Sequence, residues 1–358
     1  RSVYSVIQRN FDECKNPMNI IFLGSLIGLF KKIFEDKKQP LYGRISAKIN
    51  LKPFSFKDSI SVLKYLKYTD LENVLKIYSL FGGFPKYYAS LEQFDLIDKG
   101  YLEIINYLFL QENAPLENEV LNILKQEFGR RSPLYYSILY SIASGKTKLN
   151  EIAASVNLRG SSITRHLLEL EEKFELIKSI KPLNNEKSKR YFINHPLVLF
   201  WFKFIYGKFS DYEIRDVKDL SIFIEKGFNT FFGRRFEEIC KEFILELNNK
   251  NKLPFKIDYL NNWWGNARVQ GEKKEIEIDM IALNKELRKS LFIECKWKNE
   301  LNTFGVLESL KQKSEFFNWN KSKREEHFCI IAKSFKNRPN EKNVSLYNLN
   351  DIGKEIGF

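Results

Sequence analysis

The spacing of apolar residues along the chain changes from helical to strand-like, and this pattern predicts the order of its elements. Residues 55–66, "SFKDSISVLKYL", have helical spacing behind Ser55, a residue type that caps helix N-termini. Glycine and proline at 82–85 break the next helical pattern, which predicts a tight turn or a helix start there. The chain beyond is expected to be mostly helical through Phe128.

Two stretches before Ser55 have the pattern of strands. The apolar run Ile20–Leu23 reads as a short buried strand that ends at Gly24 and passes into a helix. Residues 44–54 alternate between apolar and polar positions, as a half-buried strand does. We treat 1–128 as the first structural region.

Three short amphipathic helices and a strand pair are predicted from Pro133 onward. Breaks at Gly145 and Gly160 separate the helices, and "LIKSIKPLNNEKSKRYFINHP" reads as strand, polar turn and strand. Three short helices followed by a β-hairpin are typical of a winged helix-turn-helix. We therefore expect such a domain at 129–206.

An α/β domain is predicted at the C-terminal end, after a polar and charged linker at 207–226. A helix containing "FGRRFEEIC" precedes three strand-like stretches, a helix and a last buried strand, "HFCIIAKSF". The order α-β-β-β-α-β indicates an α/β domain at 227–358. The fold class predicted for the chain is therefore multidomain, helical in its first part and α/β in its last.

Composition and charge narrow the class of partner. The 58 Lys and Arg residues outnumber the 45 Asp and Glu residues and give a formal net charge of +13, which favours a polyanion such as nucleic acid. A protein from a lysine-rich proteome would show the same excess of basic residues without having a polyanionic partner. The four cysteines show no C-x-x-C spacing, and the chain has neither a signal peptide nor an apolar run of about 18 residues. These features predict a cytoplasmic protein with reduced thiols and no membrane partner.

The charges in two of the predicted strands indicate a possible site. Asp279 closes the alternation "EIEID", while Glu294 and Lys296 share one face of the next strand because side chains alternate between faces. Carboxylates that converge on a sheet are costly unless a cation neutralises them. Mg²⁺ suits two carboxylates, the backbone carbonyl of Cys295 and several waters. Lys296 can then orient or help deprotonate a metal-bound water.

The same residues allow a simpler interpretation as solvated charges on an exposed strand. The tripeptide Glu-Cys-Lys occurs a second time, at 13–15, in a polar, loop-like setting, so that Glu-x-Lys alone is weak evidence. What favours a site is the context. Asp279 lies a hairpin's distance upstream, and an apolar strand surrounds Glu294. A helix that carries Glu237 and Glu238 precedes both.

A second candidate surface lies on the predicted winged helix, whose recognition helix would run from Ser161 to Leu170. Its polar N-terminal face and the basic residues of the hairpin turn are of the types that meet phosphates and base edges. Winged helices also mediate protein contacts, and the serines and the threonine would then only cap the helix. The residues expected at DNA are Arg159, Ser161, Ser162, Thr164, Arg165, Lys187, Lys189 and Arg190.

Four motifs of the C-terminal region, "FGRRFEEIC", "WWG", "EIEIDMIAL" and "LFIECKW", resemble the nuclease-like C-terminal domain of the archaeal ATPase family. That domain is a branch of the PD-(D/E)XK superfamily, so the resemblance implies a restriction-endonuclease-like fold and Mg²⁺-dependent phosphodiester cleavage. It makes Asp279 and Glu294 the metal ligands. It also implies Lys313 as a further phosphate contact. The catalytic residues that match its pattern are Glu237, Asp279, Glu294 and Lys296.

The first region has its own resemblance, to AAA+/STAND-type ATPases. "IIFLGSLIGLF", "PLYGR", "LKPFSFKD" and "FGGFPKYY" are similar to the end of the nucleotide-binding module and the helical lid that follows it. The resemblance implies that Ser25 lies near a γ-phosphate and that Arg44 stabilises charge there. Without it, Gly24 and Ser25 read as a helix cap and Arg44 as a solvated turn residue.

The ATPase pattern is incomplete in this chain. No G-x-x-x-x-G-K-[ST] motif occurs, because in "SGKT" at 144–147 Tyr140 stands where the first glycine is required. "FDE" at 11–13 lacks the apolar strand that precedes a Walker B acid. We therefore expect a C-terminal fragment or a truncated relative that does not hydrolyse ATP alone and uses ATP only with a missing N-terminal half.

The function predicted from the sequence is that of the C-terminal portion of an archaeal-type ATPase, which binds DNA and carries a Mg²⁺-dependent nuclease-like domain. The alternative is a catalytically inactive DNA-binding or protein-interaction module of an ATP-dependent switch. DNA is the expected partner, and a homo-oligomer or a partner protein is left open.

Overall fold

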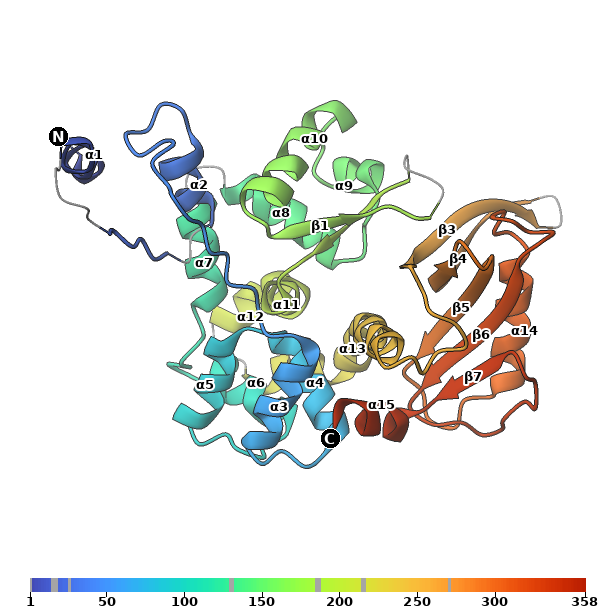
Figure 1. The fold of residues 1–358 in the computed structure, drawn as a ribbon. Helices are drawn as coiled ribbons and strands as arrows, with labels where there is room; N and C mark the ends of the chain where they lie inside the picture. Colours follow the sequence, from blue (N-terminus) through green and yellow to red (C-terminus); the bar gives the residue numbers. More distant parts are fainter. Residues whose placement is uncertain are drawn as a thin grey trace. The chain divides into compact units, whose positions relative to one another are not determined.

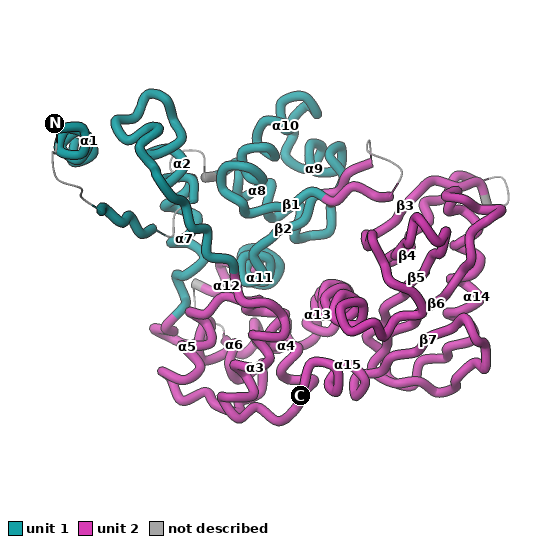
Figure 2. Tube along the Cα trace, viewed as in Figure 1, with its two compact units in different colours: residues 1–52, 116–179, 191–207 teal, residues 53–115, 180–190, 208–358 magenta. Residues whose placement is uncertain are grey.

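The computed structural model divides the chain into two compact units (Figure 2). The first unit combines 1–52, 116–179 and 191–207, and the second combines 53–115, 180–190 and 208–358. Ser25 and Lys187, two of the expected site residues, lie outside the described part of the chain. The described residues are 2–13, 19–24, 27–128, 132–183, 188–213, 217–269 and 272–358.

The first unit contains the three helices predicted from Pro133 onward, α8 (Ser132–Ala143), α9 (Leu149–Ser155) and α10 (Gly160–Leu168). The strand pair is also present, because β1 (Ile177–Ile180) and β2 (Arg190–Ile193) form a two-stranded sheet. The division between the units falls within this hairpin. Further helices of this part are α1 (Val3–Glu13), α2 (Ile27–Glu35), α7 (Glu119–Phe128), η3 (Glu169–Lys173), α11 (Pro196–Phe200), η4 (Trp201–Ile205) and η5 (Tyr206–Lys208).

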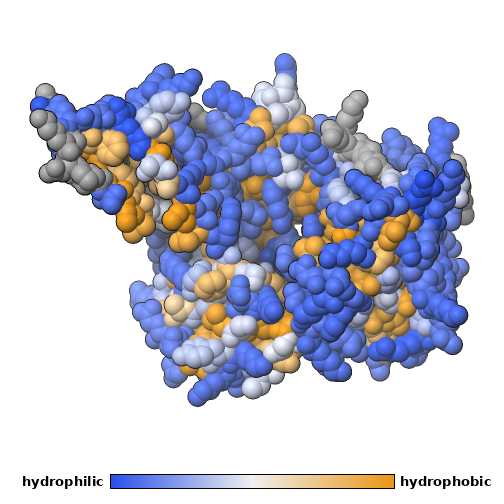
Figure 3. Space-filling view, in the orientation of Figure 1, coloured by the Kyte–Doolittle hydropathy of each residue, from blue (hydrophilic) through white to orange (hydrophobic). Residues whose placement is uncertain are grey.

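The two strand predictions before Ser55 are wrong. Residues 20–23 are irregular, with Ile21 82% and Leu23 92% accessible and only Phe22 half-buried, and residues 44–54 are irregular as well. An apolar run becomes a strand only beside another strand that satisfies its backbone groups. No strand precedes β1 in the described part of the chain. Figure 3 shows hydrophobic side chains exposed in the region of α1 and α2.

The second unit begins with helices whose ends the sequence predicts. The Ser55 side chain caps α3 (Phe56–Tyr65) by accepting from the backbone N–H of Asp58 at 3.1 Å. α4 (Leu71–Phe81) stops at Gly82, and α5 (Pro85–Gln93) starts at its proline. The others are α6 (Tyr101–Ile105), η1 (Asn106–Leu110), α12 (Phe209–Glu213), α13 (Val217–Asn249), α14 (Thr303–Ser314) and α15 (Leu349–Ile356).

The segment 207–226, for which the sequence suggested a linker, is helical over its described part. α13 is a single helix of 33 residues that starts inside this segment. The helix buries an apolar residue at every fourth position, at Leu220, Ile224 and Phe228. The sequence pattern did not reveal this stripe because charged residues lie between these positions. None of the described helices is both long enough and apolar enough to cross a membrane.

The second unit is built on a mixed sheet of order β3-β4-β5-β6-β7. β3, β4 and β5 pair antiparallel, while β5, β6 and β7 pair parallel with α14 connecting β5 to β6. In Figure 1, α13 and α14 lie on opposite faces of this sheet. The strands are β3 (Tyr259–Val269), β4 (Glu272–Asn284), β5 (Lys289–Lys296), β6 (Glu325–Ala332) and β7 (Val344–Tyr347).

The predicted α-β-β-β-α-β order is present but does not end the domain, because β7 and α15 follow β6. β7 has four residues, all half-buried, so it carries no apolar run or clean alternation that a sequence pattern would reveal. The chain is thus a mixed α/β protein of more than one unit.

The face of the sheet beneath α14 holds the core that keeps β4 and β5 in register. Phe292 is fully buried there, with its ring 5.7 Å from that of Phe328 and 6.0 Å from that of Phe317. Leu307 and Leu310 of α14 belong to the same cluster.

We expect Phe292→Ala to lower the free energy of unfolding by about 3–5 kcal/mol, because it removes a buried ring and leaves a cavity. Urea unfolding followed by circular dichroism measures the change. Leu287→Ala is the matched control: Leu287 is 56% exposed, and its loss should cost less than about 0.5 kcal/mol. Equal costs for the two variants would contradict the burial of Phe292.

Candidate active site

A bulge in β4 presents the first of the candidate carboxylates. Between the pairs Asn261↔Ile281 and Trp263↔Ile278, β3 has one residue while β4 has two, Asp279 and Met280. The Asn262 side-chain amide donates to the backbone oxygen of Asp279 at 2.7 Å and so satisfies a carbonyl that the bulge takes out of the ladder. Bulges turn side chains in directions that a regular strand does not allow.

β4 and β5 bring Asp279, Glu294 and Lys296 together. The Lys296 Nζ atom lies 2.7 Å from Glu294 Oε1 and 3.6 Å from Asp279 Oδ2. The backbone N–H of Cys295 donates to Asp279 Oδ2 at 2.7 Å. From α14, Lys313 adds a second ammonium group, 3.0 Å from Glu294 Oε1. Two lysines therefore face two carboxylates, and Lys313 is an internal ion-pair partner here.

Both carboxylates are withdrawn from solvent. Glu294 is 4% exposed, and the Asp279 side chain is 12% exposed, which does not fit the interpretation of solvated strand charges. Although Glu294 Oε1 accepts from two lysines, its Oε2 atom is buried with no hydrogen-bond partner in the described structure. An ionised oxygen buried in this way costs free energy unless a cation or another donor reaches it.

The third carboxylate, Glu237, comes from α13. This helix packs against the end of β5. The rings of Phe232 and Phe236 lie 4.6 and 5.0 Å from that of Trp297, the residue that follows β5. Burial, together with the negative charges of Asp279 and Glu277, raises the pKa of Glu237 to about 8. This carboxyl group therefore holds a proton at neutral pH.

The protonation of the other groups follows from the same crowding. Burial and the charge of Glu294 raise the pKa of Asp279 to about 6, against the opposing charge of Lys296. For Lys296, burial alone would lower the pKa, but the charges of Asp279 and Glu294 outweigh it and raise the pKa above its usual value. Lys296 therefore stays charged between Asp279 and Glu294.

The donor set fits a hard divalent cation that keeps most of its waters. Mg²⁺ is commonly bound by one or two carboxylates. Asp279 and Glu294, whose Oε2 atom has no hydrogen-bond partner, match that chemistry. Within the described residues, no three His, Cys, Asp or Glu side chains stand close enough together to form a full metal cage. Glu237 is a neighbour of this pair, because the charges of Asp279 and Glu294 act on its carboxyl group.

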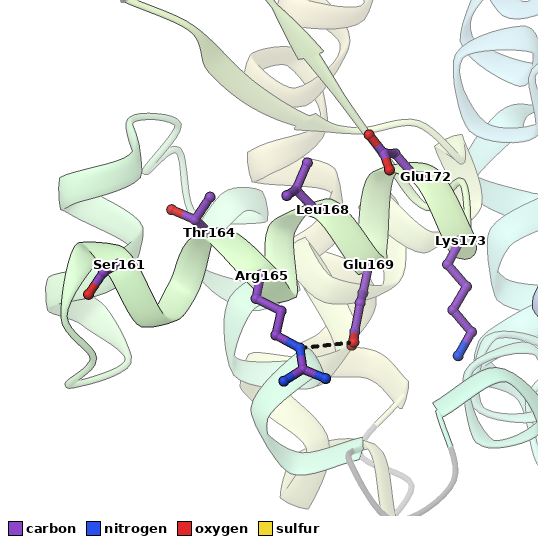
Figure 4. Close-up of a pocket in the computed structure, with 7 residues that line it drawn as sticks. All are labelled: Ser161, Thr164, Arg165, Leu168, Glu169, Glu172 and Lys173. Carbon is purple, nitrogen blue, oxygen red and sulfur yellow. Dashed lines mark ion pairs between the residues drawn. The ribbon is translucent and has the colours of Figure 1, made fainter.

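The residues expected at DNA divide into two groups. On α10, Ser161, Ser162 and Arg165 are exposed, as is Arg159 at its N-cap. Thr164 is turned to its own helix, because its hydroxyl donates to the Gly160 carbonyl at 2.9 Å. A shallow hollow of about 450 Å³ runs along this helix (Figure 4). Its lining residues are Ser161, Thr164, Arg165, Leu168, Glu169, Glu172 and Lys173.

Two acids in that hollow were not expected from the sequence. Glu169 lies 3.5 Å from the Arg165 guanidinium, and Glu172 follows on the next turn (Figure 4). Both acids belong to η3, which continues from α10. Glu169 stands four residues after Arg165, which is the sequence signal that would have found it, whereas Glu172 points to the other side of the helix (Figure 4). The hollow beside α10 is therefore lined by charges of both signs and is not uniformly basic.

The hairpin residues are placed differently. Lys189 is half-buried, whereas Arg190 is only 8% exposed and is ion-paired with Glu275 and Glu277 of β4. Its guanidinium is therefore not available to a phosphate. The basic composition of the turn does not reveal this, because the acids lie more than 80 residues away in sequence.

Of the two nucleotide-proximal residues, only Arg44 is described. Its guanidinium donates to Asp12 Oδ1 at 2.9 Å and Oδ2 at 2.8 Å, and to the Pro40 carbonyl at 2.9 Å. The hydrogen bond from Arg44 lowers the pKa of Asp12. Arg44 is thus fixed by an ion pair with Asp12 and is not a simple solvated turn residue.

Comparison with known proteins connects this site to a family. The chain is 31% identical to the uncharacterized protein MJECL04 of Methanocaldococcus jannaschii over 362 aligned positions, which cover 98% of this chain and 76% of that protein. The chain belongs to the same family. A family model for archaeal and bacterial proteins of unknown function, DUF234, matches residues 201–313. The DUF234 segment contains Glu237, Asp279, Glu294, Lys296 and Lys313.

Two solved structures of other proteins align with part of this chain. A point mutant of ZitR from Lactococcus lactis is 19% identical and covers 39% of this chain and 99% of its own, with a TM-score of 0.18. Protein VC1899 from Vibrio cholerae is 13% identical and covers 69% of this chain and 56% of its own, with a TM-score of 0.26. Both TM-scores are too low to bear on the fold or the function.

The raised pKa values make the stability of the fold depend on pH. Asp279 and Glu237 contribute stability that is complete below their ordinary pKa values of 3.8 and 4.5 and is lost as pH rises through about 6 and about 8. We expect Glu237→Gln to match the wild type at pH 4 and to be more stable by about 1–2 kcal/mol at pH 9.5, measured by urea unfolding.

Glu238→Gln is the control for that measurement. Glu238 is the next residue of α13 and is ion-paired with Arg235, so its replacement should give no gain at pH 9.5. A pH profile of Glu237→Gln that follows the wild type throughout would contradict the placement of Glu237 beside Asp279.

Proposed function

We propose that this chain is a DNA-binding protein whose C-terminal domain hydrolyses phosphodiester bonds with Mg²⁺. The observation that carries the proposal is the buried Glu294, whose Oε2 atom has no partner, beside Asp279 and Lys296 at a strand bulge. The resemblance to the PD-(D/E)XK pattern supports it, since the matching residues converge. The two buried carboxylates are suited to bind a divalent cation, and a cation bound there could in turn bind a phosphate group of the substrate.

The roles of the side chains follow from their charges and protonation. Mg²⁺ held by Asp279 and Glu294 would supply a Lewis acid and lower the pKa of a bound water. Lys296, kept charged by its two acids, is placed to donate hydrogen bonds to a phosphate oxygen or to the attacking water. Glu237 holds a proton at neutral pH on a carboxyl group that can donate to a phosphate oxygen or pass the proton on.

DNA binding is proposed for the exposed face of α10. Arg159, Ser161, Ser162 and Arg165 lie on or beside its N-terminal half, which is where recognition helices meet DNA. The formal net charge of +13 supports a polyanionic partner. Arg190 is left out of this surface because its charge is already paired.

A second candidate is a DNA-binding module that does not cleave. This function is favoured by the ammonium groups of Lys296 and Lys313, which lie 2.7 and 3.0 Å from Glu294 Oε1. They neutralise the acids without any metal. A site that carries its own counter-ions can keep the nuclease-like fold for interaction alone. Binding that weakens steeply with salt, with no cleavage under any divalent metal, would support this function over the first.

ATP enters the proposal only as an effector. The resemblance to AAA+/STAND ATPases supports a nucleotide-dependent switch, while the sequence contains no Walker A motif. We therefore propose that ATP acts on this chain only together with a segment or partner that supplies the phosphate-binding loop.

Asp279→Ala and Lys296→Ala should each reduce Mg²⁺-dependent cleavage of plasmid DNA by a factor of about 10²–10⁴, because each removes a charge that acts on the reacting phosphate. Cleavage is followed on agarose gels with 5 mM EDTA as the metal-free reference, roughly the excess needed to remove a weakly bound Mg²⁺. Circular dichroism shows whether each variant is folded.

Glu13→Ala is the matched control, since Glu13 begins the other Glu-Cys-Lys tripeptide and its exposed side chain pairs with Arg9. Its cleavage rate should equal that of the wild type. Wild-type rates in both Asp279→Ala and Lys296→Ala would end the assignment of this site.

For DNA binding, Arg159→Ala and Arg165→Ala should each weaken affinity for duplex DNA and reduce the slope of log K against log salt by about 1, the value for one lost phosphate contact. Fluorescence anisotropy with a labelled duplex between about 50 and 200 mM salt covers the range in which that slope is measured. Arg9→Ala removes the same charge from exposed α1 and should leave the slope unchanged. Equal slopes in all three variants would rule out α10 as the DNA surface.

A further inference from the structure

The described residues at the far end of the β1–β2 hairpin, 180–183 and 188–190, which we call the hairpin tip, belong to the second unit (Figure 2) and pack against its sheet. Leu183 is buried in the core cluster with Trp263 and Leu283. The Asn261 side-chain amide donates to the Lys181 carbonyl at 2.9 Å, and the Trp264 indole N–H donates to the Ser188 carbonyl at 2.9 Å. Both arms of the tip are therefore held by β3.

Arg190 is the charged centre of this attachment. Its guanidinium lies 4.3 Å from the ring centre of Trp264, 3.1 Å from a Glu275 oxygen and 3.0 Å from a Glu277 oxygen. The arginine side chain is 10% exposed, whereas those of Glu275 and Glu277 are 35% and 51% exposed. One buried cation from the hairpin therefore pairs with two more exposed carboxylates of β4.

Glu277 connects this ion pair to the candidate active site. It lies two residues before Asp279, on the regular side of the bulge, and is paired with Trp264 across the β3–β4 ladder. Its charge is among those that raise the pKa of Glu237. The residue that Arg190 restrains is thus an electrostatic neighbour of the carboxylate cluster.

We propose that Arg190 is a positioning residue of the candidate site, which by holding Glu277 against Trp264 keeps a further carboxylate away from the divalent cation. The inference rests on the metal site of the proposed function. It assigns the hairpin tip a role other than DNA contact, namely setting how much negative charge the site presents.

The sign of the effect follows from Coulomb attraction. Once Arg190 is neutral, Glu277 is half exposed, unpaired and free to turn toward the cluster, where its charge attracts a divalent ion. A charge that stays about 10 Å away in solvent changes the affinity by less than about twofold at physiological salt. A carboxylate that approaches the ion should change it by more than about fivefold.

The experiment measures Mn²⁺ binding to the full chain by isothermal titration calorimetry at about 0.15 M salt, the ionic strength at which distant charges are screened. The variants are R190M, R190K, E277Q and R190M/E277Q. We expect R190M to bind Mn²⁺ more than about fivefold more tightly than the wild type. R190K retains the charge and should bind as the wild type does. In the E277Q background the gain from R190M should fall below about twofold.

Lys289→Met is the matched control. Lys289 pairs with Glu325 at 3.1 Å and lies five residues before Glu294 on β5, about 17 Å along the strand. The Lys289→Met substitution removes one positive charge from the same sheet and should leave the Mn²⁺ affinity unchanged. Thermal unfolding identifies any variant that loses its fold. R190Q, which keeps a planar polar group against Trp264, replaces R190M if R190M does not fold.

Each outcome separates this inference from the proposed function. Equal affinity in the wild type and R190M overturns the role of Arg190 and leaves the metal site standing. A full gain in the E277Q background overturns the role of Glu277. Binding by R190M with none by the wild type supports the inference and overturns the proposed metal site of the native chain. No binding by either overturns both.

Discussion

The burial of charged carboxylates at the β4 bulge is the constraint on which the rest of the site depends. Glu294 and Asp279 are held where water reaches them poorly, so every neighbouring group is arranged around their charge. Lys296 bridges the two, Lys313 adds a second cation, and the Cys295 N–H supplies a hydrogen bond. Burial and the nearby charges of Asp279 and Glu277 also raise the pKa of Glu237.

The unpartnered Oε2 atom of Glu294 sets this cluster apart from an ordinary structural ion pair. A structural pair is normally satisfied at each polar atom, because an unpaired buried oxygen costs free energy with no return in packing. Glu294 Oε2 is such an atom, and it belongs to the residue that the PD-(D/E)XK resemblance assigns to the metal. The two internal lysines, in turn, show how the same fold would persist without a metal.

The hairpin shows how composition can mislead about function. Lys189 and Arg190 lie in a basic turn of a winged-helix-like segment, where sequence reasoning assigns them to DNA. In the structure, Arg190 is stacked on Trp264 and paired with two glutamates of β4. A buried arginine with two acidic partners is a structural and electrostatic element of the sheet, and its charge cannot also serve a phosphate. The proposed DNA contact therefore rests on α10, beside which Glu169 and Glu172 of η3 line the same hollow.

The sequence by itself determined the local elements. Helical spacing and the residues at Ser55, Gly82 and Pro85 located helices because caps and turns are short-range effects, and alternation located β3 to β6. It also singled out Asp279, Glu294 and Lys296. Only the tertiary structure decided that residues 20–23 form no strand, that β7 joins the sheet edge, and that α13 runs through the expected linker. It alone brought Lys313 to Glu294 and Arg190 to Glu277, since burial and ion pairing depend on residues far apart in the chain.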